Sequence, residues 1–113
     1  MKRIFATLTV AGAVAAAAFG TASAQDDTAK IALVHGLSGS PLEVYSKQTS
    51  TGFQLGLEYA TNGTMEIKGK KIELIEKDTQ FKPDIARAAL AEAYGDDEAL
   101  IAVGGTSSGV TTA

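Results

Sequence analysis

The stretch "KIALVHGLSGSP", Lys30 to Pro41, decides the first unit of the fold. Residues 30–35 form a short, continuous apolar run, which is typical of a buried strand. Residues 36–41 are dense in glycine, serine and proline, and this composition predicts a loop directly after the strand. A helical pattern begins at Leu42 or Glu43. The sequence therefore predicts a strand, a loop and a helix in that order.

The predicted helix carries its less polar residues at intervals of three and four, and Asn62-Gly63 is a typical C-cap signal after its last turn. The residues that set this spacing are Tyr45, Thr49, Phe53, Gly56, Leu57 and Ala60. The next segment, residues 65–78, alternates in polarity and is interrupted at Gly69. It predicts a short strand or turn that leads into a longer strand.

A second round of the same pattern follows. Pro83 stands where a helix would begin, and apolar residues continue at helical spacing to Tyr94-Gly95. Residues 99–103 are another apolar run, after which a further helix begins. Alternating strands and helices predict an α/β fold with a parallel sheet flanked by helices on both faces. Ligands of such sheets bind outside the carboxyl ends of the strands, where we expect three loops: residues 36–44, 78–83 and 104–108.

The first residues have the form of a secretory signal. Residues 1–3 are basic, residues 4–20 are apolar, and Ala22-Ser23-Ala24 is an A-x-A cleavage site, so we expect residues 1–24 to be a signal peptide removed before Gln25. An uncleaved membrane anchor is the alternative, although the apolar run is short for a span of roughly 20 residues. We expect a periplasmic protein without a lipid anchor or disulfides, because the chain contains no cysteine.

The charge balance argues against nucleic acid as a partner. The chain has 10 lysines and arginines against 13 aspartates and glutamates, a net charge of −3. No basic patch stands out from this background. We therefore expect a small-molecule ligand.

Residues 105–109, "GTSSG", fit the G-x-S-x-G pattern of a hydrolase nucleophile elbow. Ser107 would be the nucleophile and His35-Gly36 the oxyanion loop, which makes a secreted α/β-hydrolase the alternative function. The triad order of that fold places the acid and the histidine after the serine, whereas the one histidine of this chain precedes Ser107. The polypeptide as it stands cannot assemble a triad.

The same loop can instead hold an anion. Gly104 and Gly105 would let the backbone approach a ligand closely, and Ser107 and Ser108 would lie at the N-cap and first turn of a helix. Amides that are free there, and the positive end of the helix dipole, favour a carboxylate. Ser107 capping its helix without any ligand is the structural alternative.

Other polar residues have competing interpretations. Ser40 offers a ligand hydroxyl or an N-cap before Pro41 at N1, and Tyr45 is either a ligand contact or an ordinary core residue. For Asp78 we favour a structural role that orders backbone amides. His35 is expected to be a satisfied polar residue rather than a metal ligand, since no second histidine and no cysteine could join it. We predict no cofactor and no metal.

The charged residues of the segment that contains Gly69 are expected to form a solvated face. They are Glu66, Lys68, Lys70, Lys71, Glu73, Glu76 and Lys77.

Three segments together resemble the beginning of a known family. They are "KIALVHGLSGSPLEVYSKQTSTGFQLGLEYATN", "IKGKKIELIEKDTQFKPDIARAALAEAY" and "LIAVGGTSSGVTTA". In their order and spacing they resemble the periplasmic branched-chain amino-acid binding proteins, the type I solute receptors of ABC transporters. The likeness covers nearly all of residues 25–113, which would be the N-terminal part of lobe 1 of a two-lobed protein.

The resemblance implies a ligand held between two lobes, with its α-carboxylate gripped by a serine of the loop that residues 104–109 resemble. Ser108 matches that serine best, Ser107 is second, and Thr106 belongs to the same loop. Tyr45 stands where an aromatic residue lines the family's cleft, after the loop that contains Ser40. Gly109 departs from the family, in which hydroxyl residues are frequent at that position.

From the resemblance we expect a periplasmic receptor, not an enzyme, that delivers an amino acid or a related small carboxylate to a membrane permease of an ABC transporter. A branched-chain amino acid is the expected ligand. We also expect a monomer, and we expect that this stretch alone binds ligand weakly or not at all.

Overall fold

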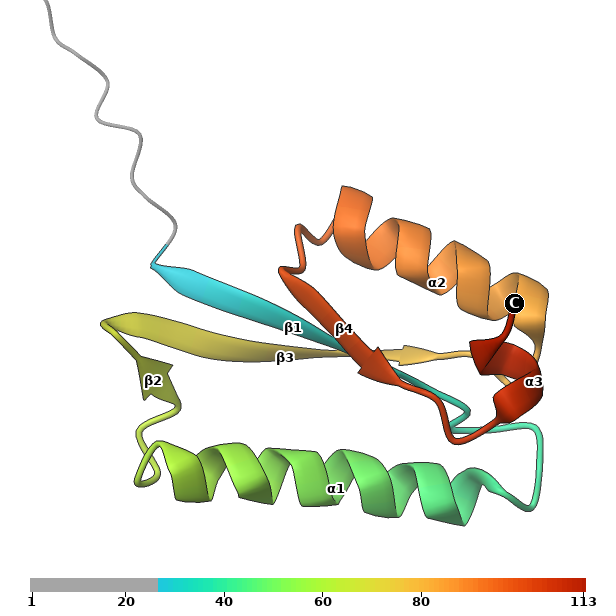
Figure 1. The fold of residues 1–113 in the computed structure, drawn as a ribbon, viewed down its shortest axis with the longest axis horizontal. Helices are drawn as coiled ribbons and strands as arrows, with labels where there is room; N and C mark the ends of the chain where they lie inside the picture. The colour runs from blue at the N-terminus through green and yellow to red at the C-terminus, as the bar shows by residue number, and fades with distance from the viewer. Residues whose placement is uncertain (1–26) are drawn as a thin grey trace, which may run out of the picture.

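The computed structural model describes residues 27–113, so the expected signal peptide lies outside the described residues. The elements follow the predicted order (Figure 1). The strands are β1 (Thr28–His35), β2 (Glu66–Ile67), β3 (Lys70–Asp78) and β4 (Ile101–Gly104), and the helices are α1 (Glu43–Ala60), α2 (Pro83–Gly95) and α3 (Ser108–Thr111).

The four strands form one sheet in the order β2-β3-β1-β4. Strand β1 is parallel to both neighbours, with Leu33 opposite Glu76 on β3 and Val103 on β4. Strand β2 is antiparallel to β3, because the two are joined by a tight turn at Lys68 and Gly69, whose φ angles are +51° and +78°. The predicted α/β fold with a parallel sheet is confirmed, and only the short β2 runs the other way.

Helices α1 and α2 lie on opposite faces of the sheet (Figure 1). The face toward α2 is packed by small apolar side chains, which let the helix approach the strands closely. This core cluster consists of Ala32, Val34, Ala89, Ala93 and Ala99. At its side, Lys77 pairs with Glu92 and Asp97 at 2.7 and 2.6 Å.

The expectation of a fully solvated charged segment is wrong for Lys77. Only 14% of its side chain is exposed, because its alternate position on β3 points it toward α2 and two carboxylates. Glu66, Lys68, Lys71 and Glu73 are exposed as expected.

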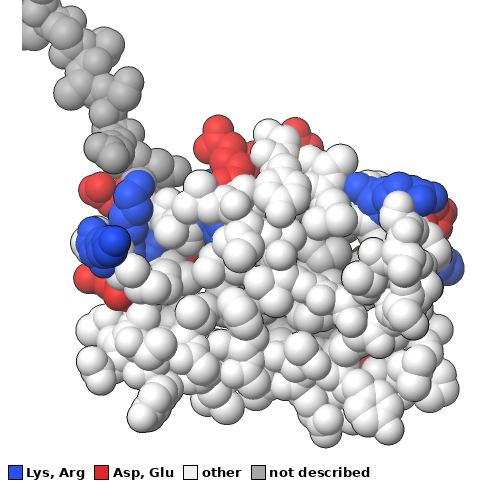
Figure 2. All heavy atoms as spheres, viewed as in Figure 1, with Lys and Arg blue, Asp and Glu red and all other residues white. Residues whose placement is uncertain are grey.

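Polar side chains contribute to the attachment of helix α1 to the sheet. The buried residues of α1 are Ser46 and Ser50. The Ser46 hydroxyl is hydrogen-bonded to that of Thr106 at 2.5 Å, and Ser50 donates a short hydrogen bond to the Glu76 carboxylate. The surface over α1 in Figure 2 is almost free of charged side chains, which are seen instead toward the left and right ends of the molecule and, as a group of acidic residues, at its top.

Within residues 27–113, no helix combines the length and the apolar character that a membrane span requires.

Candidate ligand-binding site

The carboxyl ends of β1, β3 and β4 lie at one edge of the sheet, since the three strands are parallel. The loops that leave this edge are residues 36–42, 79–82 and 105–107. They are the three loops in which the sequence predicted ligand contacts. Hydrogen bonds tie them to one another and to α1.

Asp78 joins the first two loops. Its Oδ1 accepts hydrogen bonds from the backbone N–H groups of Leu37 at 2.8 Å, Ser38 at 3.3 Å and Gln80 at 2.9 Å, and its Oδ2 accepts one from the Ser38 hydroxyl at 2.5 Å. Burial opposes ionisation of this carboxyl group, but the hydrogen bonds from Ser38, Gln80 and Leu37 outweigh it and hold the pKa of Asp78 below its usual 3.8. The predicted structural role of Asp78 is confirmed.

The two glycines of the third loop are required by the chain itself. A Cβ atom on Gly104 would lie 2.1 Å from the carbonyl oxygen of Val34, so β4 could not pair with β1 at this point. Gly105 has a φ of +103°, and a Cβ there would lie 2.7 Å from Oγ1 of Thr111. We expected these glycines to allow the backbone to approach a ligand closely. In the structure they allow it to approach β1 and α3, where a Cβ atom would clash.

Ser107 occupies the N-cap position of α3 with extended backbone angles, φ −122° and ψ 117°. Its carbonyl oxygen accepts hydrogen bonds from Val110 N at 3.1 Å and Thr111 N at 2.9 Å. Its hydroxyl makes no capping hydrogen bond within the described helix. The predicted position is confirmed, but the side chain does not perform the capping that the structural alternative required.

Thr106 and Ser108 flank this residue in different environments. The Thr106 hydroxyl is bonded to Ser46 of α1, and Ser108 is exposed as the first residue of α3. The hydroxyl-bearing loop is thus fixed to α1 on one side and open to solvent on the other.

Ser40 does not cap α1. The N-cap position belongs to Leu42, because residues 41 and 42 form a turn before the helix begins at Glu43. Ser40 orders that turn, since its hydroxyl accepts from Leu42 N at 3.2 Å and its carbonyl from Glu43 N at 3.0 Å. The interpretation with Pro41 at N1 is wrong.

Tyr45 is 58% exposed, so the interpretation of this residue as part of the core is wrong. Tyr45 directly precedes Ser46, whose hydroxyl is hydrogen-bonded to that of Thr106. This hydrogen bond joins the first turn of α1 to the serine-containing loop. Sequence analysis missed Ser46. The available signal was a hydroxyl residue at helical spacing from the apolar Phe53 and Leu57 on the inner side of α1.

His35 ends β1 beneath the same loop and is 2% exposed. Neither ring nitrogen has a hydrogen-bond partner among the protein atoms of residues 27–113, so no protein group there provides the expected satisfaction of this residue. Burial lowers the pKa of the ring below 6.5, and the nearby Glu76 carboxylate only partly offsets this. No hydrogen bond joins His35 to Ser107 in this part of the chain, as a serine nucleophile would require.

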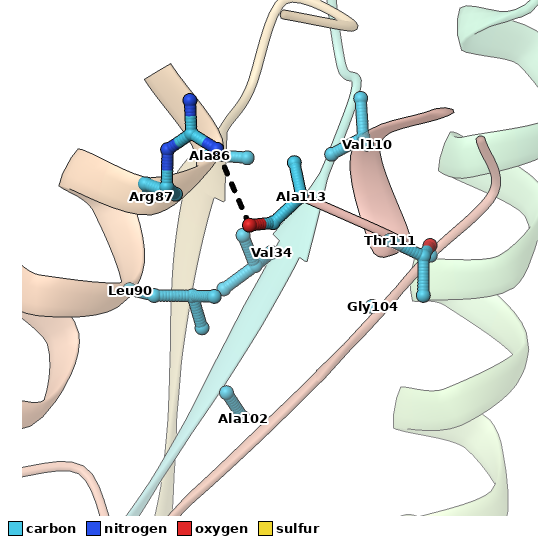
Figure 3. A pocket seen from close by; sticks show the side chains of 10 residues that line it. Val34, Ala86, Arg87, Leu90, Ala102, Gly104, Val110, Thr111 and Ala113 are labelled. Carbon is cyan, nitrogen blue, oxygen red and sulfur yellow. Dashed lines mark hydrogen bonds between the residues drawn. The ribbon is translucent and has the colours of Figure 1, made fainter. Parts of the chain in front are cut away.

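A separate pocket of about 200 Å³ opens between β4, α2 and α3 (Figure 3). Its wall is mostly apolar, with Val34, Leu90 and Val110 among the lining residues, and Arg87 at its rim donates a hydrogen bond to the carbonyl oxygen of Ala113 at 3.2 Å. None of the five predicted ligand contacts lines it.

Residues 28–113 match the family described as periplasmic binding protein. The chain belongs to this family. The suspected resemblance is thereby confirmed, and solved structures support it further. A search of curated proteins found no match.

Two similar structures come from Rhodopseudomonas palustris. An ABC transporter protein has 58% identity and a TM-score of 0.72, with 74% of this chain covering 24% of that one. An ABC-type branched-chain amino acid transporter protein has 60% identity and a TM-score of 0.70, with coverages of 73% and 22%. A third, more distant structure is a solute-binding protein of an ABC transporter from the same species in complex with 3,4-dihydroxybenzoic acid. It has 28% identity, a TM-score of 0.59 and coverages of 67% and 20%.

The periplasmic binding protein described here spans about a quarter of the length of the structures it matches. Members of this family that serve ABC transporters bind solutes and are not enzymes, and the comparisons give the hydrolase alternative no support.

Proposed function

We propose that residues 25–113 form the N-terminal part of lobe 1 of a periplasmic receptor, which binds a small carboxylate and delivers it to the membrane permease of an ABC transporter. A branched-chain amino acid is the favoured ligand, because the relative named for branched-chain amino acids is 60% identical and the complex with 3,4-dihydroxybenzoic acid is 28% identical. Both named compounds carry a carboxylate, which is the group this lobe would grip.

One observation carries the proposal. At the carboxyl edge of the sheet, Ser107 keeps its hydroxyl free of capping and Ser108 is exposed beside it. Two hydroxyls that donate to one carboxylate make charge-assisted hydrogen bonds, which are the stronger kind. Thr106 would hold the loop against α1, and Tyr45 would cover the ligand from the first turn of that helix. Ser40 shapes the loop that precedes it.

The rest of the receptor follows from the family. The second lobe would supply the contacts to the remainder of the ligand, and the protein would act as a monomer in the periplasm after removal of residues 1–24. The first lobe alone would bind weakly, since half of the cleft would be missing.

Isothermal titration of the full-length receptor with leucine, isoleucine, valine and 3,4-dihydroxybenzoate tests this function. Ser108→Ala should weaken binding of the accepted ligand by about 10- to 150-fold, the loss of one hydrogen bond to a charged group. Thr49→Ala is the matched control, because the Thr49 hydroxyl donates only to the carbonyl of Tyr45 in its own helix. Wild-type affinity in Ser108→Ala, or failure of every carboxylate to bind, would contradict the proposal.

A further inference from the structure

A small, partly open cavity lies beneath the serine-containing loop. It has a volume of about 10 Å³ and is bordered by the buried ring of His35 and by Thr79, Thr106 and Ser107. A space of this size accommodates a single water molecule, and a buried water needs two to four polar partners. The cavity adjoins the pocket of Figure 3, with which it shares Val34, Gly105 and Val110, and it borders Ser107, one of the proposed carboxylate contacts.

The ring of His35 has unmet hydrogen-bonding capacity. A neutral imidazole has one N–H donor and one acceptor nitrogen, and neither has a partner in residues 27–113. Buried polar groups of this kind are paired with protein atoms or with ordered water in nearly all structures. The backbone of His35 is fixed to the neighbouring loop, because its carbonyl oxygen accepts a hydrogen bond from Thr79 N at 2.8 Å.

The hydroxyls that border the cavity also have unused hydrogen-bonding capacity. Thr79 is 1% exposed, and its Oγ1 accepts from Phe81 N at 3.3 Å, which leaves its proton to donate. Ser107 does not use its hydroxyl for capping. Thr106 and Ser46 share one hydrogen bond between two hydroxyls, so one proton of this pair is also free.

We propose that this cavity binds one structural water molecule, which links the ring of His35 to the hydroxyls of Thr106 and Ser107 and makes His35 a positioning residue of the carboxylate site. The proposal deepens the proposed function and rests on it for the last clause. The water accepts from or donates to the ring and donates to a hydroxyl of the loop. That hydroxyl then directs its own proton outward, where a ligand carboxylate would accept it.

Burial keeps the ring neutral in this role, and the nearby carboxylates, which favour the charged ring, do not outweigh it. Two carboxylates face His35 from β3: Asp78, which is its register partner, and Glu76, which is one alternate position back on the same face of the sheet. Asp78 is engaged by the loop amides and Glu76 by Ser50. From α1 the buried Ser46 and Ser50 face the sheet, and residues 104–107 carry no charge. A neutral ring can both donate and accept, which a bridge through water requires.

The first test is a crystal structure of the full-length receptor without ligand, at a resolution that shows ordered waters. We expect a water within hydrogen-bond distance of a His35 ring nitrogen and of the Thr106 or Ser107 hydroxyl. A cavity without density, or a ring nitrogen bonded directly to a protein group, would overturn the proposal. This outcome does not depend on ligand binding, so it is distinguishable from failure of the proposed function.

The second test separates positioning from simple packing. His35→Leu should weaken ligand binding by about tenfold, whereas His35→Gln, whose side chain can donate and accept, should recover most of the affinity. Both affinities are compared at conditions where circular dichroism shows full folding. Equal affinity in the Leu and Gln variants would refute the role of His35. Nitrogen NMR of the wild-type ring provides a readout without mutation: a single neutral tautomer supports the bridge, and a ring that exchanges between tautomers argues against it.

Discussion

Replacement of Asp78 by alanine should destabilise the sheet edge that carries the site. Asp78→Ala removes the acceptor of three backbone amides and one hydroxyl at once. The bond to Leu37 N is partly buried and is worth about 1.5 kcal/mol or more with a charged acceptor, whereas the exposed bonds contribute about 0.5 kcal/mol each after solvent screening. We therefore expect the free energy of unfolding to fall by about 2 to 4 kcal/mol.

Two companion variants sharpen this measurement. Asp78→Asn keeps a carbonyl oxygen for the amides and loses mainly the charge, so it should lose about half as much. Asp96→Ala removes an exposed carboxylate at the end of α2 and should change the free energy of unfolding by less than about 0.5 kcal/mol. Urea unfolding of the full-length receptor, monitored by circular dichroism, measures the free energy of unfolding of all three variants. The comparison requires that the free energy falls with urea concentration at the same slope in each protein.

The pH dependence supplies an independent check. Because the pKa of Asp78 is lowered in the folded state, its contribution to stability is complete above the unfolded value of 3.8 and is lost as the pH falls through the lower folded value. The difference between wild type and Asp78→Asn should therefore begin to shrink near pH 3.8 and disappear only once the pH has fallen below the lower folded pKa. If the free energy of unfolding of Asp78→Ala at pH 7 were within about 0.5 kcal/mol of the wild-type value, the reasoning would be refuted.

Three further outcomes can be measured on the same protein. Gly104→Ala should lower the free energy of unfolding by about 3 kcal/mol or more, because the new Cβ would lie 2.1 Å from the Val34 carbonyl oxygen. Gly52→Ala, a helix-interior position in α1 with open space around the new Cβ, should raise the free energy of unfolding by about 0.5 to 1 kcal/mol. Since the pKa of His35 is lowered in the folded state, wild type should lose stability relative to His35→Gln as the pH falls below 6.5, and equal pH profiles would exclude this. A fluorophosphonate probe should leave Ser107 unmodified by mass spectrometry, since the His35 ring makes no hydrogen bond to it within residues 27–113, and labelling would revive the hydrolase interpretation.

The order of elements was predictable because it depends on patterns along the chain. The continuous apolar run at residues 30–35, the break at Gly69 and the helix start at Pro83 all predicted elements that the structure contains. These signals are local, and they report burial averaged over several residues. They therefore predicted the three loops at the carboxyl edge and the position of Ser107 at an N-cap.

The orientation of α1 was not predictable from the same signals. The spacing of Tyr45, Thr49 and Phe53 predicted that Tyr45 and Thr49 face the sheet. In the structure the next residues, Ser46 and Ser50, are the buried ones. A hydroxyl is buried at low cost when it is hydrogen-bonded, and the partners of these two serines lie far away in sequence. Periodicity cannot register a partner 60 residues distant, as Thr106 is from Ser46.

The two faces of the sheet differ in the side chains buried against their helices, and this difference bears on the proposed site. Alanines and Val34 pack the α2 face, where non-directional apolar contact fixes the helix without specifying any hydroxyl direction. The α1 face carries Ser46 bonded to Thr106, and hydrogen bonds are directional, so they fix the geometry of the loop to which they attach. A ligand contact on residues 106–108 would therefore be oriented by the hydrogen bond between Thr106 and Ser46 of α1. Replacement of Ser46 or Thr106 should therefore change ligand affinity more than stability, and substitutions among the alanines should do the reverse.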